Sequence, residues 1–298
     1  MNRIHIPALV DLLPVSDPAQ IAMLADDVRL DRDYVAKGPL LNRIILSRIR
    51  KDLVWDGAPF PPVAPRGPAR PLPAQAALEA RLAEVVAGLV NDESALGGLA
   101  AYVRGDAPTG DAGPLAQQAV GRLFDPGYQA DDASWQAALT LDAAPRSFNP
   151  LQILWWALTG AVPKARRLLA DKVGGDPSGI HGTGVAVHNI VAGLQQMRTL
   201  WKDGANRRRL PPAGAAAHCL VAPQQVIRQP RKAGLCIAGA FEPTTLVMLQ
   251  LDKAHTQRPT AEMAFMAQSW ARCPAHAWVL ALLAGTWRVA QEHTTHAL

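Results

Sequence analysis

Apolar residues recur every three or four positions along several stretches of the chain, and this spacing predicts helices. The stretches lie at 40–53, 74–90, 151–169 and 179–201. A shorter helix is expected after Ser16-Asp17-Pro18, because Asp caps a helix N-terminus well and Pro suits its first position. In the longest helix, the stripe expected to face the core is Val187, Ile190, Leu194, Met197 and Trp201.

The pattern changes after residue 220, where short β-branched or apolar runs are separated by Gly and Pro. These runs are Val226–Arg228, Leu235–Ile237 and Thr245–Leu249. Such spacing predicts a small antiparallel sheet. We therefore expect a mostly α protein with a small antiparallel β-sheet, in a single domain over residues 1–298. Its parts are helices and loops at 1–150, central helices at 151–218, and the sheet, a cysteine segment and a terminal helix at 219–298.

Proline positions, a tryptophan pair and an arginine cluster add local detail to the helical part, and the last two allow two interpretations. Pro163 is expected to break the 151–169 stretch, and Pro-rich residues 57–73 are expected to form an extended surface loop. Trp155 and Trp156 are expected in the core, and Arg207–Arg209 in a solvated turn. The alternative is that these residues form a docking face for an acidic partner.

Composition narrows the class of protein. The chain has 298 residues, 49% of them hydrophobic, which is typical of a globular protein. A net charge of +5 favours anionic partners such as an acidic electron-transfer protein, and does not by itself indicate nucleic acid. Three widely spaced cysteines argue against a disulfide framework. With neither a signal-like N-terminus nor an apolar run of about 20 residues, we expect a cytoplasmic bacterial protein without a membrane span.

The candidate chemistry centres on Cys273, which precedes Pro274 and an apolar stretch. A cysteine at a helix N-terminus meets free N–H donors, and with Arg272 beside it a thiolate is favoured. Such a thiolate is a candidate haem-iron ligand or nucleophile. The alternative is a buried structural thiol, which is what we expect of Cys219 and Cys236.

The motifs around Cys273 follow a familiar order over about 65 residues. They are Leu220-Val221-Ala222-Pro223, Val226-Ile227-Arg228, Gly239 to Val247, Ala254-His255-Thr256-Gln257-Arg258-Pro259 and Arg272-Cys273-Pro274. In this order they resemble the haem-binding part of the cytochrome P450 family. Near the N-terminus, Pro14 to Ile21 and Arg32-Asp33-Tyr34 resemble the family's entry helix.

The resemblance implies a reduced P450-like fold with haem b as cofactor and Cys273 as the ligand to iron. Arg228 would bind a haem propionate, with Arg66, Arg70 and His276 as further candidates. His188 and His181 would lie on the distal side, where His188 would handle protons. The activity implied is oxidation of a small organic substrate, as a monooxygenase with an electron donor or as a peroxygenase. The alternatives are a surface Arg228 and histidines that only cap or pack.

The sequence also departs from the family pattern. Residues 216–219 read Ala-Ala-His-Cys where a Glu-x-x-Arg pair is expected, and Ala275 replaces a usual Gly. The loop before Cys273 has no Phe-x-x-Gly, and the long helix lacks an acid–alcohol pair. These departures support a second hypothesis: a haem-free P450-like helper or interaction protein without catalysis.

Overall fold

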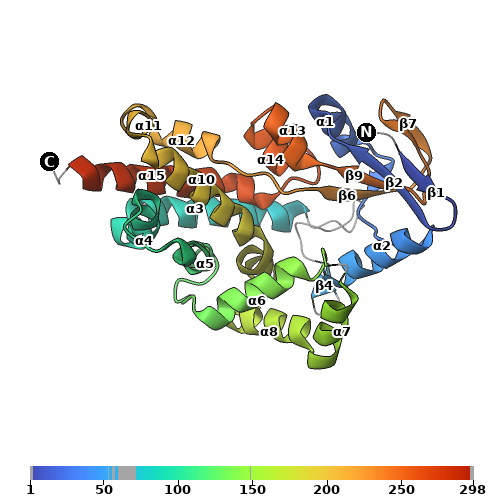
Figure 1. Cartoon of the computed structure of the whole chain (residues 1–298), viewed down its shortest axis with the longest axis horizontal. Helices are drawn as coiled ribbons and strands as arrows, with labels where there is room; N and C mark the ends of the chain where they lie inside the picture. Colours follow the sequence, from blue (N-terminus) through green and yellow to red (C-terminus); the bar gives the residue numbers. More distant parts are fainter. Residues whose placement is uncertain (1–2, 53, 56–57, 60–71, 148, 296–298) are drawn as a thin grey trace. The chain divides into compact units, whose positions relative to one another are not determined.

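The computed structural model describes residues 3–52, 54–55, 58–59, 72–147 and 149–295. The chain divides into two compact units (Figure 1). Unit 1 comprises Met1–Gln75 and Ala222–His276, and unit 2 comprises Ala76–Val221 and Ala277–Leu298. Each unit therefore combines segments that are distant in sequence. The single domain over residues 1–298 stays a prediction.

Unit 1 is built around a five-stranded sheet with the order β1-β2-β9-β6-β3. The strands are β1 (Ile4–Ile6), β2 (Val10–Val15), β3 (Leu30–Asp31), β6 (Val226–Pro230) and β9 (Leu246–Leu249). β2 runs parallel to β9 and places Leu13 opposite Val247. β6 runs antiparallel on the other side of β9 and places Arg228 opposite Val247. The core of the sheet thus joins strands from both ends of the sequence.

The structure confirms the predicted antiparallel pairing of the strands at 226–228 and 245–249. The run near 235 pairs instead within its own hairpin, between β7 (Gly234–Cys236) and β8 (Gly239–Phe241). β1 and β2 were not expected. Asp11 interrupts the apolar pattern of β2, yet it is buried because Arg3 binds its carboxylate at 2.7 Å and Thr245 Oγ1 donates to it at 2.6 Å.

Two helices of unit 1, at Pro18 and Leu40, begin where the sequence predicts, whereas the two after residue 250 were not expected. These helices are α1 (Pro18–Asp26), α2 (Leu40–Asp52), α13 (Leu251–Gln257) and α14 (Ala261–Phe265), and β4 (Val54–Trp55) pairs with β5 (Ala58–Pro59). Asp17 caps α1 by accepting the Gln20 amide at 2.8 Å. α2 contributes Leu46 to a buried cluster with Tyr34 and Leu246, which attaches the helix to the sheet.

The described residues of unit 2 form helices joined by turns and loops, with no strand. Its helices are most of α3 (Leu72–Asn91), then α4 (Glu93–Arg104), α5 (Ala112–Arg122), α6 (Asp132–Ala143), α7 (Pro150–Thr159), α8 (Ala161–Lys172), α9 (Pro177–His181), α10 (Val187–Lys202), α11 (Gly204–Arg209), α12 (Pro212–His218) and α15 (Val279–Thr295). α10 packs against α4 and α5, while α15 packs against α4 and α12.

The long helix predicted at 179–201 is present. It begins with α9, passes through a π-helical turn at Gly182–Ala186, and continues as α10. Val187, Ile190, Leu194 and Met197 are each at most 2% exposed, which confirms the predicted core stripe. At the π-helical turn, a Cβ on Gly184 would lie 2.9 Å from Leu141 Cδ1, so glycine permits this close packing.

Two predictions for residues 151–169 are wrong. The helix breaks at Gly160, whose φ of +61° suits a left-handed C-cap, and Pro163 lies in the first turn of α8, where proline is tolerated. Trp155 is 64% exposed and Trp156 is half-buried, so this pair is not a core element. Helical spacing alone says which residues share a face, and it does not say whether another element covers that face.

Candidate functional site

Cys273 closes a loop that begins at the end of α14. Met266 adopts a left-handed backbone with φ of +51°, which turns the chain out of the helix. The Cys273 amide then donates to the Phe265 carbonyl at 2.9 Å, fixing both ends of the loop. Cys273 is half-buried and leads into a 3-10 turn at Pro274–Ala277. The expected apolar helix, α15, begins only at Val279, so Cys273 does not open an α-helix directly.

His276 is attached to this same turn. Its Nδ1 lies 2.8 Å from the Cys273 carbonyl, which also accepts the His276 amide at 3.1 Å. A carbonyl only accepts hydrogen bonds, so Nδ1 carries the ring proton and donates it. His276 therefore orients the backbone of Cys273, and its Nε2 is the ring atom left for contact with a ligand.

Arg228 lies at the centre of β6 and is fully buried. Its guanidinium donates to the Ile227 carbonyl at 3.1 Å and reaches Met266 Sδ at 3.6 Å. The guanidinium carbon also lies 5.7 Å from the Trp270 ring centroid. The alternative of a surface arginine on an edge strand is wrong. Arg228 instead contacts the loop that carries Cys273.

A second buried arginine reaches the same loop, and we assigned it no role from the sequence. Arg32 follows β3, is 7% exposed, and donates to the Ala271 carbonyl at 2.7 Å. Its guanidinium carbon lies 5.4 Å from the Trp270 ring centroid. Burial lowers the pKa of Arg32, while Tyr34, Cys273 and Asp31 oppose that shift. The motif Arg32-Asp33-Tyr34 marks the position in the sequence, but nothing local links it to Cys273.

The donor set of unit 1 fits a carboxylate-bearing haem. One loop carries a thiol at Cys273 and an indole at Trp270, and two buried guanidiniums contact that loop. Thiolates are established haem-iron ligands, and guanidiniums bind carboxylates in bidentate fashion. Because burial disfavours the charge of Arg32, a carboxylate placed beside it would be strongly bound.

The remaining candidates belong to unit 2 or lie outside the described residues. His188 and His181 belong to unit 2, whereas Cys273 belongs to unit 1. The His188 Nε2 lies 3.2 Å from the Ala138 carbonyl, and its ring packs at 5.1 Å against Trp135. Burial is the main cause of its lowered pKa. Arg66 and Arg70 lie outside the described residues, as do the side chains of Arg207 and Arg208.

Cys219 and Cys236, the two cysteines not assigned to iron, differ in how far they are buried. Cys219 is fully buried, and burial raises the pKa of its thiol to about 12, so it is an inert core residue as expected. Cys236 is only half-buried, in the β7–β8 hairpin, where its Sγ lies 3.4 Å from the Gly239 carbonyl. The expectation of a core position is therefore confirmed for Cys219 and wrong for Cys236.

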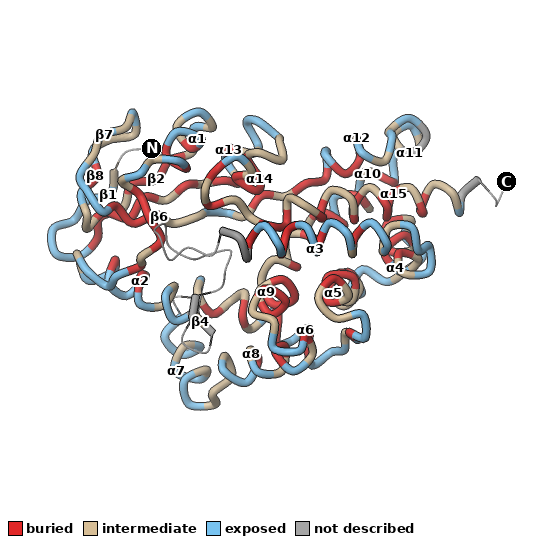
Figure 2. The backbone as a smooth tube through the Cα atoms, turned by 180° about the vertical axis from the view of Figure 1, so that it is seen from behind, coloured by how far each residue is buried: buried red, intermediate tan, exposed pale blue. Residues whose placement is uncertain are grey.

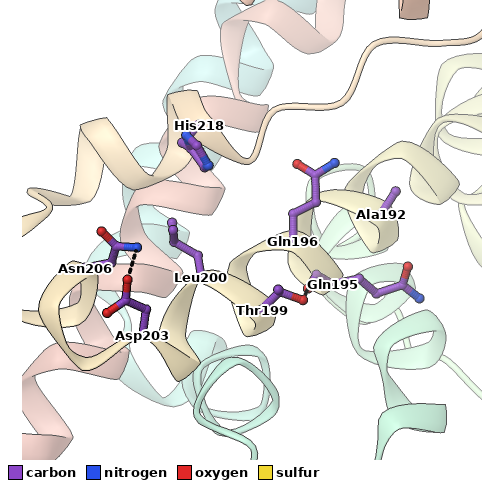
Figure 3. Close-up of a pocket in the computed structure, with 8 residues that line it drawn as sticks. All are labelled: Ala192, Gln195, Gln196, Thr199, Leu200, Asp203, Asn206 and His218. Atoms are coloured by element: carbon purple, nitrogen blue, oxygen red, sulfur yellow. Dashed lines mark hydrogen bonds between the residues drawn. The ribbon is translucent and has the colours of Figure 1, made fainter. Parts of the chain in front are cut away.

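Unit 2 also contains a polar pocket of about 590 Å³ (Figure 3). Its walls come from α10, α11 and α12 and include Gln195, Gln196 and His218. The carboxylate of Asp203 accepts the Ala205 amide as the cap of α11 and binds the Asn206 side chain at 2.9 Å. The Asp203 carboxylate, the acidic group of the pocket, therefore serves as a helix cap. We assign the pocket no catalytic role.

Three solved structures show which fold this arrangement represents. CYP105N1 from Streptomyces coelicolor A3(2) matches with a TM-score of 0.62 and 12% identity, over 98% of this chain and 83% of its own. Cytochrome P450-153 from Novosphingobium aromaticivorans matches with a TM-score of 0.55 and 14% identity, over 98% of this chain and 85% of its own. CYP154C4 from Streptomyces sp. W2061 matches with a TM-score of 0.55 and 14% identity, over 97% of this chain and 83% of its own.

The chain has a cytochrome P450 fold. This confirms the predicted fold class, a mostly helical P450-like chain with a small sheet. No protein-family model and no curated protein sequence matches the chain. The P450-like fold was therefore visible in sequence mainly through the order of short motifs between Leu220 and Cys273, together with the N-terminal residues Pro14 to Ile21. Among the described residues of this P450-like chain, no helix is long and apolar enough to cross a bilayer.

Proposed function

We propose that this P450-like chain is a haem-thiolate protein whose iron ligand is Cys273. The single observation that supports this most is the contact of two buried arginines, Arg32 and Arg228, with the loop that carries Cys273. Arg228 and Arg32 would each bind a propionate of haem b. His276 would hold the Cys273 carbonyl and so fix the direction of the thiolate.

When bound through a thiolate, haem b supplies an iron centre that activates oxygen. On this proposal the reaction is oxidation of a small organic substrate, with O₂ and an electron donor or with peroxide. An acidic electron-transfer protein is the proposed donor, because the chain carries a net charge of +5. The protein is proposed to work in the bacterial cytoplasm.

His188 is the proposed proton-handling residue in place of the acid–alcohol pair. Its Nε2 lies 3.2 Å from the Ala138 carbonyl, the Gly184 carbonyl also bonds the ring, and its lowered pKa favours a neutral ring near pH 7. A neutral imidazole holds one proton and retains one acceptor nitrogen, which is what a proton relay requires.

One observation favours the alternative of a haem-free helper protein. α12 consists of Pro-Ala-Gly-Ala-Ala-Ala-His and lacks the Glu-x-x-Arg pair that the resemblance leads one to expect near this position. A P450-like fold that has lost such charged residues is compatible with a purely structural role. The two hypotheses predict different optical spectra.

The test is an absorption spectrum of protein expressed with a haem supply. We expect a red protein whose reduced, CO-bound form shows a thiolate-type Soret band, and we expect Cys273→Ser to abolish that band. Cys219→Ser and Cys236→Ser serve as matched controls and should leave it intact. A colourless wild type would favour the helper protein, and an unchanged band in Cys273→Ser would remove Cys273 from the iron site.

A further inference from the structure

α7 presents a continuous apolar face to solvent. Leu151, Leu154, Trp155 and Leu158 are 76%, 55%, 64% and 75% exposed, respectively. Their spacing of three and four residues places them on one side of the helix. No residue of α7 is buried (Figure 2). The sequence of the helix contains no charged residue. Exposed apolar side chains are ordinary when scattered, but a face of this kind indicates an interaction site.

The residues beside this face are mainly cationic. From Arg146 to Lys172 the sequence contains five basic residues and one acidic residue, Asp171. α8 follows α7 directly after Gly160, and Lys164 lies in its first turn. The outward side of α8 carries a shallow groove of about 390 Å³, lined by Lys164, Arg167, Leu168, Asp171 and Lys172.

This combination fits one kind of partner better than others. An apolar helix bearing Trp and Leu, followed by Lys and Arg, has the composition of helices that lie in a membrane interface. Tryptophan favours the depth of the lipid headgroups, and cations attract anionic lipids. A purely apolar partner would not need the groove of Lys164 and Arg167, whereas an acidic protein would not need four apolar side chains.

We propose that α7 and α8 form a peripheral docking site for an anionic phospholipid surface. The face of Leu151, Leu154, Trp155 and Leu158 inserts among the lipids, and the α8 groove receives lipid phosphates. This inference does not depend on haem binding.

Vesicle co-sedimentation of the full chain tests the proposal. We expect binding to vesicles of 70% phosphatidylcholine and 30% phosphatidylglycerol in 0.1 M salt, and much weaker binding to pure phosphatidylcholine or in 0.5 M salt. The double variant Leu154→Gln/Leu158→Gln should bind at least about tenfold more weakly, because it removes apolar side chains without changing charge. Lys164→Gln/Arg167→Gln should lose the preference for phosphatidylglycerol.

Two controls make the test specific. Ile237→Gln changes a side chain that is 85% exposed in the β7–β8 hairpin and should bind as wild type does. Leu40→Gln changes another exposed apolar residue, at the start of α2, and should also leave binding intact. Trp155 should account for part of the fluorescence quenching by brominated lipid, which Trp155→Phe would then reduce. Circular dichroism checks that each variant folds.

Several outcomes overturn the proposal. Absence of binding to phosphatidylglycerol vesicles would do so, as would equal binding by wild type and Leu154→Gln/Leu158→Gln. Loss of binding in Leu40→Gln with retention in the α7 variant would place the lipid site elsewhere. Self-association that the α7 variant abolishes, without vesicle binding, would show that a second copy of the chain covers this face.

Discussion

At the residue scale, the main finding is a pair of buried arginines that contact one loop. Arg32 follows β3, and Arg228 lies in β6, which pairs with β3. Both guanidinium carbons lie near the Trp270 ring, at 5.4 and 5.7 Å from its centroid. Two buried cations destabilise a fold unless they are compensated. Asp31, Tyr34 and Cys273 favour the charged form of Arg32, and on the proposed function haem propionates would add to that compensation.

If these arginines bind propionates, Arg228→Ala and Arg32→Ala should each weaken haem retention. A charged hydrogen bond in a buried site contributes about 1–3 kcal/mol, which corresponds to roughly a tenfold to hundredfold change in affinity. Haem transfer to apomyoglobin measures the dissociation rate. Arg29→Ala is the matched control, because Arg29 stacks on Phe241 at 5.3 Å and its Nε donates to the Asp27 carboxylate at 2.9 Å. Haem retention equal to wild type in both variants would contradict the assignment.

His188 should make stability depend on pH. Its pKa is lowered in the folded state by burial, so between that value and the ordinary value near 6.5 the unfolded chain binds more protons. The free energy of unfolding should therefore rise with pH through this window. The full contribution is present above about pH 6.5 and is lost as the pH falls through the folded pKa.

Urea unfolding of wild type and His188→Gln between pH 5 and 8 measures this effect. The variant retains an N–H donor for the Ala138 carbonyl and removes the titrating group, so its stability should vary less with pH. Identical slopes in wild type and His188→Gln would mean that the imidazole does not titrate in this range.

At the element scale, the π-helical turn between α9 and α10 depends on a side chain from α5. Gln117 is fully buried, and its Nε2 donates to the Thr183 carbonyl at 3.1 Å and to the Ser134 carbonyl at 2.9 Å. Its Oε1 accepts from Ser134 Oγ at 2.8 Å. One amide thus connects α5, α6 and the wide turn. π-helical turns often mark functional positions within long helices.

Gln117→Met should destabilise the fold by about 2–4 kcal/mol, because it leaves buried polar groups of Thr183 and Ser134 without this partner. Methionine preserves the approximate volume, so the loss reports on hydrogen bonding more than on packing. The midpoint of urea unfolding is the measurement. Gln195→Met, at an exposed position of α10, should change stability by less than about 0.5 kcal/mol. Similar midpoints for the two variants would show that Gln117 does not support the turn.

At the scale of the whole molecule, haem binding should be visible as added stability. A ligand that binds only the folded state stabilises it by about 2.7 kcal/mol at a free concentration of one hundred times Kd. Added haemin should therefore raise the Tm of the apoprotein, and the rise should be much smaller in Cys273→Ser. A Tm that does not depend on haemin would favour the helper-protein hypothesis.

The sequence predicted local structure better than it predicted contacts. The cap at Asp17, the stripe of α10 and the strands β6 and β9 all follow from patterns within a few residues. Arg32 illustrates what the sequence does not show. Its partner, the Ala271 carbonyl, is distant in the chain, and its burial depends on strands that come together only in the folded unit.

The prediction that Trp155 and Trp156 of α7 lie in the core was wrong for a related reason. Its apolar spacing is that of a buried helix, and whether another element covers it is a property of the tertiary structure. Conversely, β2 is buried although Asp11 interrupts its apolar run, because Arg3 and Thr245 satisfy the carboxylate. In both cases the residues around a segment decide its environment, and their identity is not encoded within the segment.

The parallel pairing of β2 with β9 also affects how the protein is made. Ribosomes add about 5–20 residues each second, so β9 emerges roughly 10–50 s after β2. Throughout that interval the newly made β2 has no parallel partner, and its apolar side chains are available to other chains. We therefore expect the yield of folded protein in a cell to depend on chaperones that shield the first segment during translation.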